Sequence, residues 1–260
     1  MGYLITLEGG EYTGKTSLLP SLAKILQDAG HQVKTSREPG GSPQAEEFRS
    51  FIFQQLRQGI SAEEQVVLFN KARKMHINDV IRPYLGDSKE KNTILLVDRY
   101  LDSTRVYQGF EGGVQLEKIK EFENKYVNGF YPDLTLILFI PEERFTEIHH
   151  FRKQYTNFKQ THDRDIIPFD QSDISTQLQR QRYHLQLPEL AKRFNEQRAF
   201  GTIDSSQDPI RIIEDSLRKI SQFIPIISLD SCLEIMKKLD DQQYWADIKA
   251  IYIQQQDSTI

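Results

Sequence analysis

The stretch Gly9-Gly10-Glu11-Tyr12-Thr13-Gly14-Lys15-Thr16 decides the fold. It matches the pattern G-x-x-x-x-G-K-[ST] and stands between an apolar run, residues 3–7, and a helical pattern over residues 15–29. The glycines let main-chain N–H groups surround a phosphate at the positive end of the helix. Lys15 suits the β- and γ-phosphates, and the Thr16 hydroxyl suits Mg²⁺. The pattern predicts ATP or GTP binding by Gly9, Gly10, Glu11, Tyr12, Thr13, Gly14, Lys15, Thr16 and Ser17.

Further apolar runs alternate with helical patterns along the chain. A strand followed by a helix, repeated several times, predicts an α/β fold whose sheet is mostly parallel, with ligands at the carboxyl ends of the strands. Residues 151–171 are polar and predict an irregular, exposed flap, and residues 172–197 predict one long helix. Residues 222–260 can form two more helices and carry no motif. The expected strands are residues 3–7, 32–36, 92–98, 134–140 and 200–203, and the other expected helices include 44–58, 62–84 and 209–221.

Bulk composition excludes several classes of protein. The net charge of −4 and the charged fraction of 27% give no reason to expect nucleic-acid or membrane binding. Cys232 is the one cysteine, so an intrachain disulfide cannot form. No apolar run approaches the roughly 20 residues that span a bilayer, and no basic segment precedes Tyr3. These features favour a cytoplasmic protein.

Asp98 is a second candidate for metal binding. It ends the apolar run of residues 92–98 and is followed by Arg99. At this position beside a phosphate loop, a carboxylate can hold Mg²⁺ through water. An ordinary strand-end acid that pairs with Arg99 is the alternative. The glycine-rich loop favours the metal site, with Thr16 and Asp98 as the metal residues.

Four further motifs name a family. They are Arg37-Glu38-Pro39-Gly40-Gly41, Asp98-Arg99-Tyr100 with Ser103, Tyr107-Gln108-Gly109, and Tyr131-Pro132-Asp133-Leu134-Thr135. In this order and spacing, over residues 3 to about 221, the chain resembles the bacterial thymidylate kinases. The resemblance implies a three-layer α/β/α P-loop NTPase domain with a five-stranded sheet and a flexible lid. It also implies a homodimeric transferase of nucleotide biosynthesis, which phosphorylates dTMP to dTDP with ATP and Mg²⁺.

The resemblance also implies roles for single residues. Glu11 lies near the sugar 3′-hydroxyl, and Arg49 and Arg99 grip phosphate. Phe69 stacks on thymine, and Arg73 bonds its O4 atom. Phe69 and Arg73 are four residues apart on a predicted helix, hence on one face. The remaining substrate residues are Thr104 and Gln108, which read the base, Tyr107, which crowds the 2′ side of the sugar, and Glu38 and Ser103 within the motifs.

The phosphate loop departs from the family at Tyr12. Family members have a catalytic arginine there, or a small residue combined with basic groups in the lid. Without that arginine, the chain is expected to use its lid, about residues 151–171. Arg164 in Asp163-Arg164-Asp165 is the first candidate and Arg152 the second. The predicted catalytic set is Lys15, Arg99, Arg164 and Arg152.

Two alternatives stay open on the sequence. One is a related deoxynucleoside or nucleotide kinase with a changed acceptor, which Phe69, Arg73, Thr104 and Tyr107 would distinguish. The other is a catalytically degenerate nucleotide-binding P-loop protein that signals or scaffolds through residues 222–260. The intact Lys15 argues against the second alternative, as do Thr16, Asp98 and Arg99.

Overall fold

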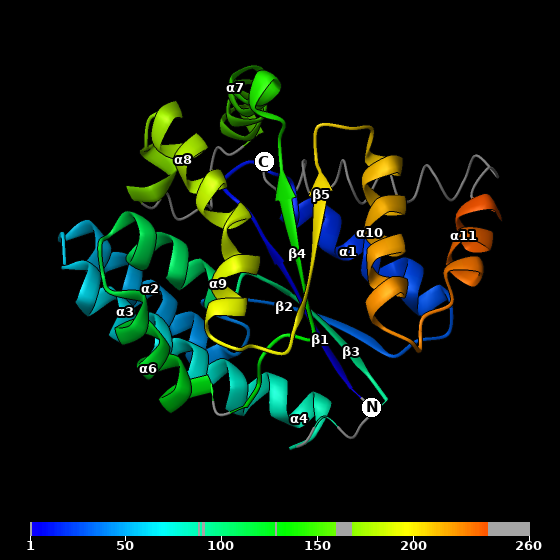
Figure 1. Ribbon diagram of the computed structural model, residues 1–260, viewed down its shortest axis with the longest axis horizontal. Helices are drawn as coiled ribbons and strands as arrows, with labels where there is room; N and C mark the ends of the chain where they lie inside the picture. The colour runs from blue at the N-terminus through cyan, green and yellow to red at the C-terminus, as the bar shows by residue number, and fades with distance from the viewer. Residues whose placement is uncertain (1, 88, 90–91, 128, 160–167, 239–260) are drawn as a thin grey trace.

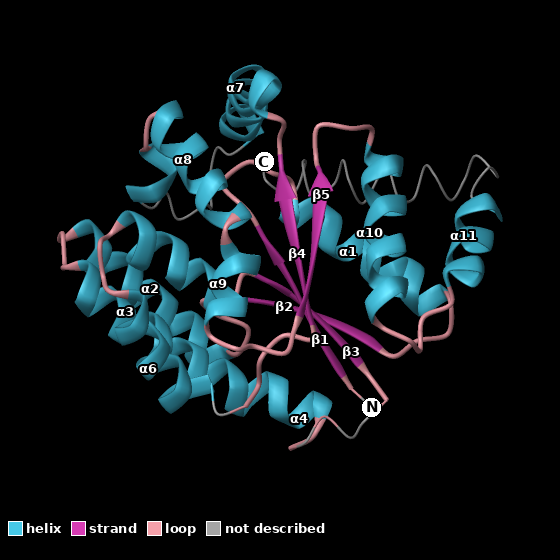
Figure 2. Ribbon diagram, viewed as in Figure 1, coloured by secondary structure: helices cyan, strands magenta, loops and turns pink. Residues whose placement is uncertain are grey.

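Five parallel strands form one sheet in the order β2-β3-β1-β4-β5 (Figure 2). The computed structural model describes residues 2–87, 89, 92–127, 129–159 and 168–238. This arrangement confirms the expected α/β class and the five-stranded sheet. The strands are β1 (Tyr3–Glu8), β2 (Val33–Arg37), β3 (Ile94–Asp98), β4 (Leu134–Phe139) and β5 (Ala199–Asp204).

Helices cover both faces of the sheet, so the domain has three layers (Figure 1). One face carries α1 (Lys15–Asp28), α10 (Pro209–Phe223) and α11 (Leu229–Lys238). The α7 helix (Glu142–Lys159) follows the end of β4, and η3 (Pro168–Gln171) is a short 3₁₀ turn. The other side holds α2 (Pro43–Arg57), α3 (Ala62–His76), α4 (Arg82–Leu85), α5 (Leu101–Thr104), α6 (Leu116–Val127), α8 (Ile174–Leu185) and α9 (Leu187–Arg193), with π-helical turns η1 (Ile77–Ile81) and η2 (Arg105–Glu111).

Alternate residues of each central strand enter different cores. On β1, Ile5 and Leu7 pack in the cluster with α1 and α10, whereas Leu4 packs in the cluster with η1 and α4. All six β1 residues are buried. Because both faces of the strand are covered, its sequence is mostly apolar and does not alternate, and its two polar residues, Thr6 and Glu8, are buried as well.

The register brings the ends of three strands to one edge. Leu7 of β1 and Arg37 of β2 both lie opposite Asp98 of β3. The residues after these positions therefore leave the sheet together, and they include Gly9, Glu38 and Arg99. This edge is where parallel α/β sheets bind ligands.

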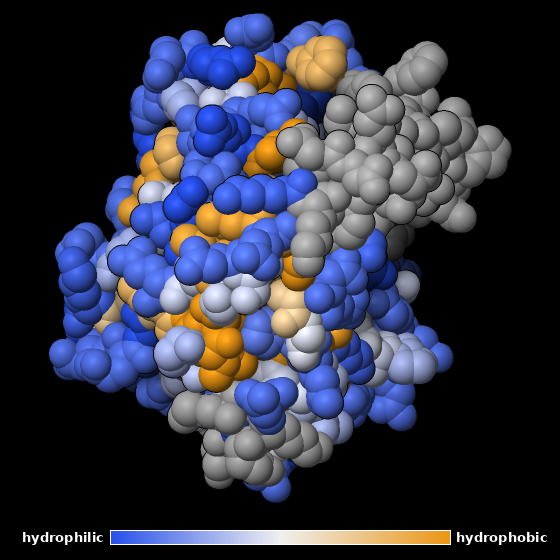
Figure 3. Space-filling view, turned by 90° about the vertical axis from the view of Figure 1, so that its right-hand side faces the viewer, coloured by the Kyte–Doolittle hydropathy of each residue, from blue (hydrophilic) through white to orange (hydrophobic). Residues whose placement is uncertain are grey.

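The first part of the carboxyl-terminal segment packs on the domain. Cys232 and Met236 of α11 are buried in the core cluster that also holds residues of α1 and α10. Ile226 and Leu233 are partly buried against the same cluster. Figure 3 views this side of the molecule, where apolar surface shows among the polar side chains. Residues 239–260, for which a second helix was expected, lie outside the described residues.

Three sequence-based expectations about helices are wrong in detail. The flap predicted from residue 151 is helical as far as Lys159, since no glycine or proline interrupts the chain between Pro141 and Pro168. The single helix expected over residues 172–197 is broken into α8 and α9, and Pro188 lies in the first turn of α9. The helix expected over 62–84 changes to a π-helical turn at Ile77.

Candidate nucleotide site

The phosphate loop joins β1 to α1 and depends on two glycines. Gly9 has a φ of 146°, and a Cβ atom there would lie 2.5 Å from the carbonyl oxygen of Leu138. Gly14, the N-cap residue of α1, has a φ of 92° in the left-handed region. The Thr13 hydroxyl donates to the Gly10 carbonyl at 2.9 Å and holds the turn closed. The loop therefore has the backbone that the pattern predicted, at the N-terminus of a 14-residue helix.

Lys15 lies folded over the loop. Its Nζ atom donates to the carbonyls of Gly9 at 2.9 Å and Gly10 at 2.8 Å. Burial, and then the positive charge of Arg99, lower the pKa of Lys15 to about 8, against the opposing effect of Asp98. A triphosphate here would favour the charged ammonium, because opposite charge stabilises the ionised form. The side chain can thus exchange carbonyl partners for phosphate oxygens.

Thr16 and Asp98 lie together, as the sequence predicted for a metal site. The Thr16 hydroxyl donates to Asp98 Oδ2 at 3.1 Å. Asp98 Oδ1 is buried and has no hydrogen-bond partner among the described residues, so a strong acceptor is left unsatisfied beside the phosphate loop. A hydroxyl and a carboxylate are hard oxygen donors of the kind that Mg²⁺ prefers, so the residues fit that ion. In the described part of the chain, no group of three or more His, Cys, Asp or Glu side chains could hold a metal ion.

Arg99 joins the phosphate loop to the segment after β3. It donates to Glu11 Oε1 at 2.6 Å and reaches the Gly9 carbonyl at 3.5 Å. Tyr107 donates to the same Glu11 oxygen at 2.7 Å and accepts from Arg99 at 3.2 Å. Burial alone would lower the pKa of Arg99, but Glu11 raises it well above the ordinary value. Burial raises the pKa of Tyr107, so its hydroxyl stays protonated.

Glu8, the last residue of β1, connects this strand to the segment that follows β3. Its carboxylate accepts from the N–H of Tyr100 at 2.8 Å and from the hydroxyl of Ser103 at 2.8 Å. Burial, and then the charge of Asp102, raise the pKa of Glu8 to about 7. Ser103 in turn accepts from Arg99 at 3.3 Å. The sequence analysis overlooked Glu8, although a carboxylate that ends an otherwise apolar strand is an unusual buried residue.

Arg73 is buried next to this segment and is almost fully hydrogen-bonded. It donates to Glu38 at 2.9 Å and to Thr104 Oγ1 at 3.1 Å. Two other donations reach Asn70 Oδ1 and the Tyr100 carbonyl, both at 3.1 Å. Four of its five N–H groups therefore have partners within the described part of the chain, and the remaining one is on Nη1. The structure thus brings together three predicted substrate residues, Glu38, Arg73 and Thr104.

The other predicted substrate residues lie around this group. Phe69 is on α3, one turn before Arg73, and is partly buried against the cluster of Phe53 and neighbouring residues. Gln108 is buried and donates to Gln65 Oε1 at 2.9 Å. Arg49, on α2, donates to the Pro39 carbonyl at 2.8 Å. Their contacts with a substrate stay predictions.

Tyr12 links the loop to α7. Its φ is 60°, a left-handed conformation, and its ring meets that of His149 edge-on at 5.0 Å. Arg152 donates to the Tyr12 carbonyl at 3.1 Å and to the Ser205 carbonyl at 2.5 Å. The helix therefore brings one of the two predicted lid arginines to the phosphate loop. The other, Arg164, lies outside the described residues.

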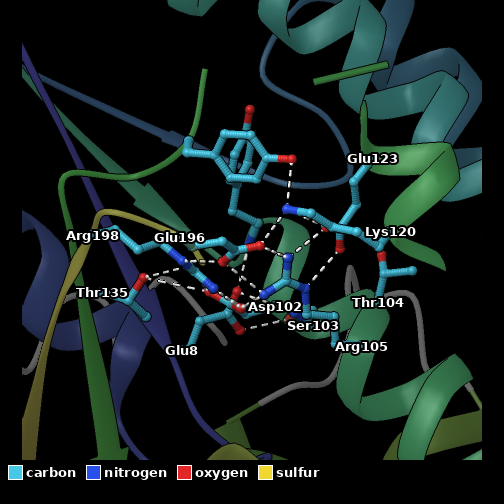
Figure 4. A network of polar contacts seen from close by, with 12 residues as sticks. Glu8, Asp102, Ser103, Thr104, Arg105, Lys120, Glu123, Thr135, Glu196 and Arg198 are labelled. Atoms are coloured by element: carbon cyan, nitrogen blue, oxygen red, sulfur yellow. Dashed lines mark hydrogen bonds and ion pairs between the residues drawn. The ribbon is translucent and has the colours of Figure 1, made fainter. Parts of the chain in front are cut away.

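A buried network of charged side chains packs next to the site (Figure 4). The sequence analysis did not predict it. Arg105 donates to both oxygens of Glu123, at 2.8 and 2.5 Å, and to Glu196 at 3.0 and 2.5 Å. Arg198 holds Asp102 at 2.5 and 2.7 Å. These partners are up to 96 residues apart in sequence, so periodicity could not have signalled them. The network fixes the segment that carries Ser103 and Thr104.

Comparisons with known proteins agree with this geometry. The sequence model of the thymidylate kinase family matches residues 7–171. Thymidylate kinases of Bartonella quintana and Bartonella henselae are 34% and 33% identical to this chain, and each alignment covers 84% of this chain and 94% of the relative. The crystal structure of thymidylate kinase from Ehrlichia chaffeensis shares the fold, with a TM-score of 0.54 at 24% identity over 78% of this chain and 92% of that one. With its phosphate loop, its Arg99–Glu11 pair and these relatives, the chain belongs to the thymidylate kinase family.

Proposed function

We propose that this protein transfers the γ-phosphoryl group of ATP to the 5′-phosphate of dTMP, forming dTDP and ADP. One observation carries the proposal. The Gly9 carbonyl accepts from Lys15 of the phosphate loop at 2.9 Å and lies 3.5 Å from Arg99 Nη1. Lys15, which suits the donor phosphates, and Arg99, which suits the acceptor phosphate, therefore both lie at the Gly9 carbonyl. A phosphoryl group transferred between two nucleotides must pass through such a point.

The acceptor side follows from the contacts of Arg99. Arg99 donates to Ser103, and Arg73 donates to Thr104, the next residue along the chain. The remaining N–H of Arg73 can donate to a carbonyl group of the acceptor base. A pyrimidine with a carbonyl at its 4-position fits one directed donor. Phe69, one turn away on α3, supplies an aromatic ring for stacking. This set favours a base with a 4-carbonyl, such as thymine, over cytosine.

Phosphoryl transfer requires that the two nucleotides are held in position and that positive charge surrounds the transferred group. The acceptor is a phosphate oxygen that is already ionised, so no strong base is required. Lys15, Arg99 and Arg152 supply cations around the loop, and such groups stabilise the charge that spreads over the transferred group. Asp98 and Thr16 would hold Mg²⁺, which when bound neutralises phosphate charge. Arg164 is proposed to join them from the lid.

A substrate panel tests the proposal. Purified protein with ATP and Mg²⁺ is assayed against dTMP, dUMP, dCMP and dGMP, with dTDP and ADP measured directly. We expect dTMP to be the best acceptor. A Lys15→Ala variant is expected to turn over about 10²–10³-fold more slowly without losing its fold, since it lacks a transition-state cation. A preference for a purine acceptor, or no product from dTMP, would overturn the proposal.

Membrane insertion and assembly of the chain are separate from its chemistry. Among the described residues, no helix is long and apolar enough to cross a bilayer. The homodimer implied by the family resemblance and the cytoplasmic location favoured by the composition stay predictions. Sedimentation of the purified chain at several concentrations measures the first directly.

A further inference from the structure

Ser36, His76 and Glu38 form a row of hydrogen bonds that ends on Arg73, with half-buried Ser36 at its outer end. His76 Nδ1 lies 2.9 Å from Glu38 Oε1, and His76 Nε2 lies 2.7 Å from the Ser36 hydroxyl. The other oxygen of Glu38 accepts from Arg73 Nε at 2.9 Å. The side chains of His76, Glu38 and Arg73 are 0%, 5% and 3% exposed. The contacts of Glu38 with His76 and Arg73 are therefore shielded from water, where a hydrogen bond has its greatest effect.

The chemistry of the partners assigns the protons. An ionised carboxylate only accepts, so His76 Nδ1 donates to Glu38. In the neutral ring the other nitrogen then accepts, and the Ser36 hydroxyl donates to it. A Cβ atom on Gly41 would lie 2.5 Å from the Ser36 oxygen and 2.9 Å from His76 Cδ2, so the turn containing Gly41 closes tightly over this contact. The imidazole ring is thus held on both sides.

We propose that His76 is a positioning residue that sets the acceptor's base specificity by fixing Glu38, an inference that rests on the proposed function. Glu38 has one donor on each oxygen, and the Arg73 donor is the one that orients the guanidinium plane. Without His76, Oε1 of Glu38 is buried without a hydrogen-bond donor, and the carboxylate therefore turns toward other donors. Arg73 then keeps its contacts with Asn70, Tyr100 and Thr104 but loses the one on Nε, so the direction of its remaining N–H is held less tightly.

This direction matters because thymine and cytosine differ at one position. Thymine presents a carbonyl acceptor where cytosine presents an amino donor. A rigid N–H donor bonds the first and opposes the second, whereas a donor that can turn away discriminates less. Loss of His76 is therefore expected to weaken dTMP binding and to relax selection against dCMP, while ATP binding is unchanged.

Two substitutions separate positioning from general damage. His76→Leu removes both hydrogen bonds of the ring. His76→Asn keeps an N–H donor the same number of bonds from Cα as Nδ1, and so retains the contact with Glu38. We expect His76→Leu to raise KM for dTMP about tenfold, and to lower the dTMP-to-dCMP ratio of kcat/KM about tenfold, with KM for ATP within about twofold of wild type. His76→Asn should recover most of both effects.

Milder variants keep the test valid if His76→Leu folds poorly. Ser36→Ala leaves the ring in place without its second support and is expected to shift KM for dTMP by about threefold in the same direction. Ser216→Ala is the matched control, because Ser216 is a buried serine on α10 whose hydroxyl donates to the Ile212 carbonyl at 2.6 Å. It should change neither KM.

The outcomes distinguish the two proposals. If the wild-type protein makes no dTDP, the proposed function fails, whatever the variants do. If wild type is active but His76→Leu alters kcat alone, changes both KM values equally or keeps full selection against dCMP, the positioning role is wrong. The same holds if His76→Asn is no better than His76→Leu, or if Ser36→Ala matches Ser216→Ala.

Discussion

Replacing Arg105 by methionine tests the buried charge network most directly. The Arg105 side chain is 1% exposed and its guanidinium contacts Glu123, Glu196 and, at 3.5 Å, Asp102. Methionine keeps the length of the stem and removes the charge. Glu196 retains Lys120 and Arg198 as partners, but the one cation that Glu123 keeps among the described residues is Lys120, at 4.0 Å. One fully buried carboxylate is therefore left almost without a counter-charge.

The expected cost follows from that residual charge. Removing one partner of a buried ion pair typically destabilises a protein by about 3–5 kcal/mol, because the other charge stays buried without compensation. We expect a loss in this range for Arg105→Met at pH 7. A pair at the surface is the proper comparison: Arg193 bonds Glu117, and both side chains are exposed. Arg193→Met should cost less than about 1 kcal/mol.

Equilibrium urea unfolding measures both variants against wild type at one protein concentration. The pH dependence gives a second check. Acting against burial, Arg105 and its neighbours lower the pKa of Glu196 to about 2 from 4.5. A carboxylate with a depressed folded-state pKa stabilises the fold above its unfolded value and loses this effect as pH falls toward the folded value. Because Arg105 is one of the cations that lower this pKa, the deficit of Arg105→Met should shrink as pH falls from about 4.5 toward 2.

One result would refute the reasoning. If Arg105→Met and Arg193→Met lower the free energy of unfolding equally, burial does not decide the strength of these pairs. A deficit that grows on acidification would likewise show that the carboxylates of the network are not ionised in the folded protein.

Three further predictions concern single residues. Arg164→Ala should lower kcat more than it raises KM for dTMP, since a lid cation would act on the transferred phosphate; steady-state kinetics with the reverse pattern would exclude Arg164 from the chemistry. Burial raises the pKa of Glu8 to about 7 from 4.5, so wild-type stability should fall as pH rises from about 5 to 8, and urea unfolding of Glu8→Gln should show a smaller fall. A Cβ atom on Gly9 would lie 2.5 Å from the Leu138 carbonyl oxygen, whereas a Cβ atom on Gly30 (φ 90°) would meet nothing within 4 Å among the described residues. Gly30→Ala should therefore lower the free energy of unfolding by about 1–2 kcal/mol, and Gly9→Ala should lower it clearly more. Equal urea midpoints for the two variants would contradict this.

The sequence by itself determined the class of the fold and the donor site. The Gly9–Thr16 pattern between a continuous apolar run and a helix specifies a strand, a tight turn and a helix start, and these are local properties of the chain. The buried strands were predictable because strands covered on both faces consist mostly of apolar residues. Asp98 and Arg99 followed from their place at a strand end.

The tertiary structure alone decided which polar side chains meet. Glu38 and His76 are 38 residues apart and Arg198 and Asp102 are 96 apart, and their pairing depends on strand order and helix packing. Local propensity also could not reveal the π-helical turns at Ile77 and Arg105, since these insert into helices whose sequence pattern is otherwise regular. Residue types fix what a short segment of backbone can do, whereas the partners of a buried charge are chosen by the whole fold, because only complete burial makes an unpaired charge too costly.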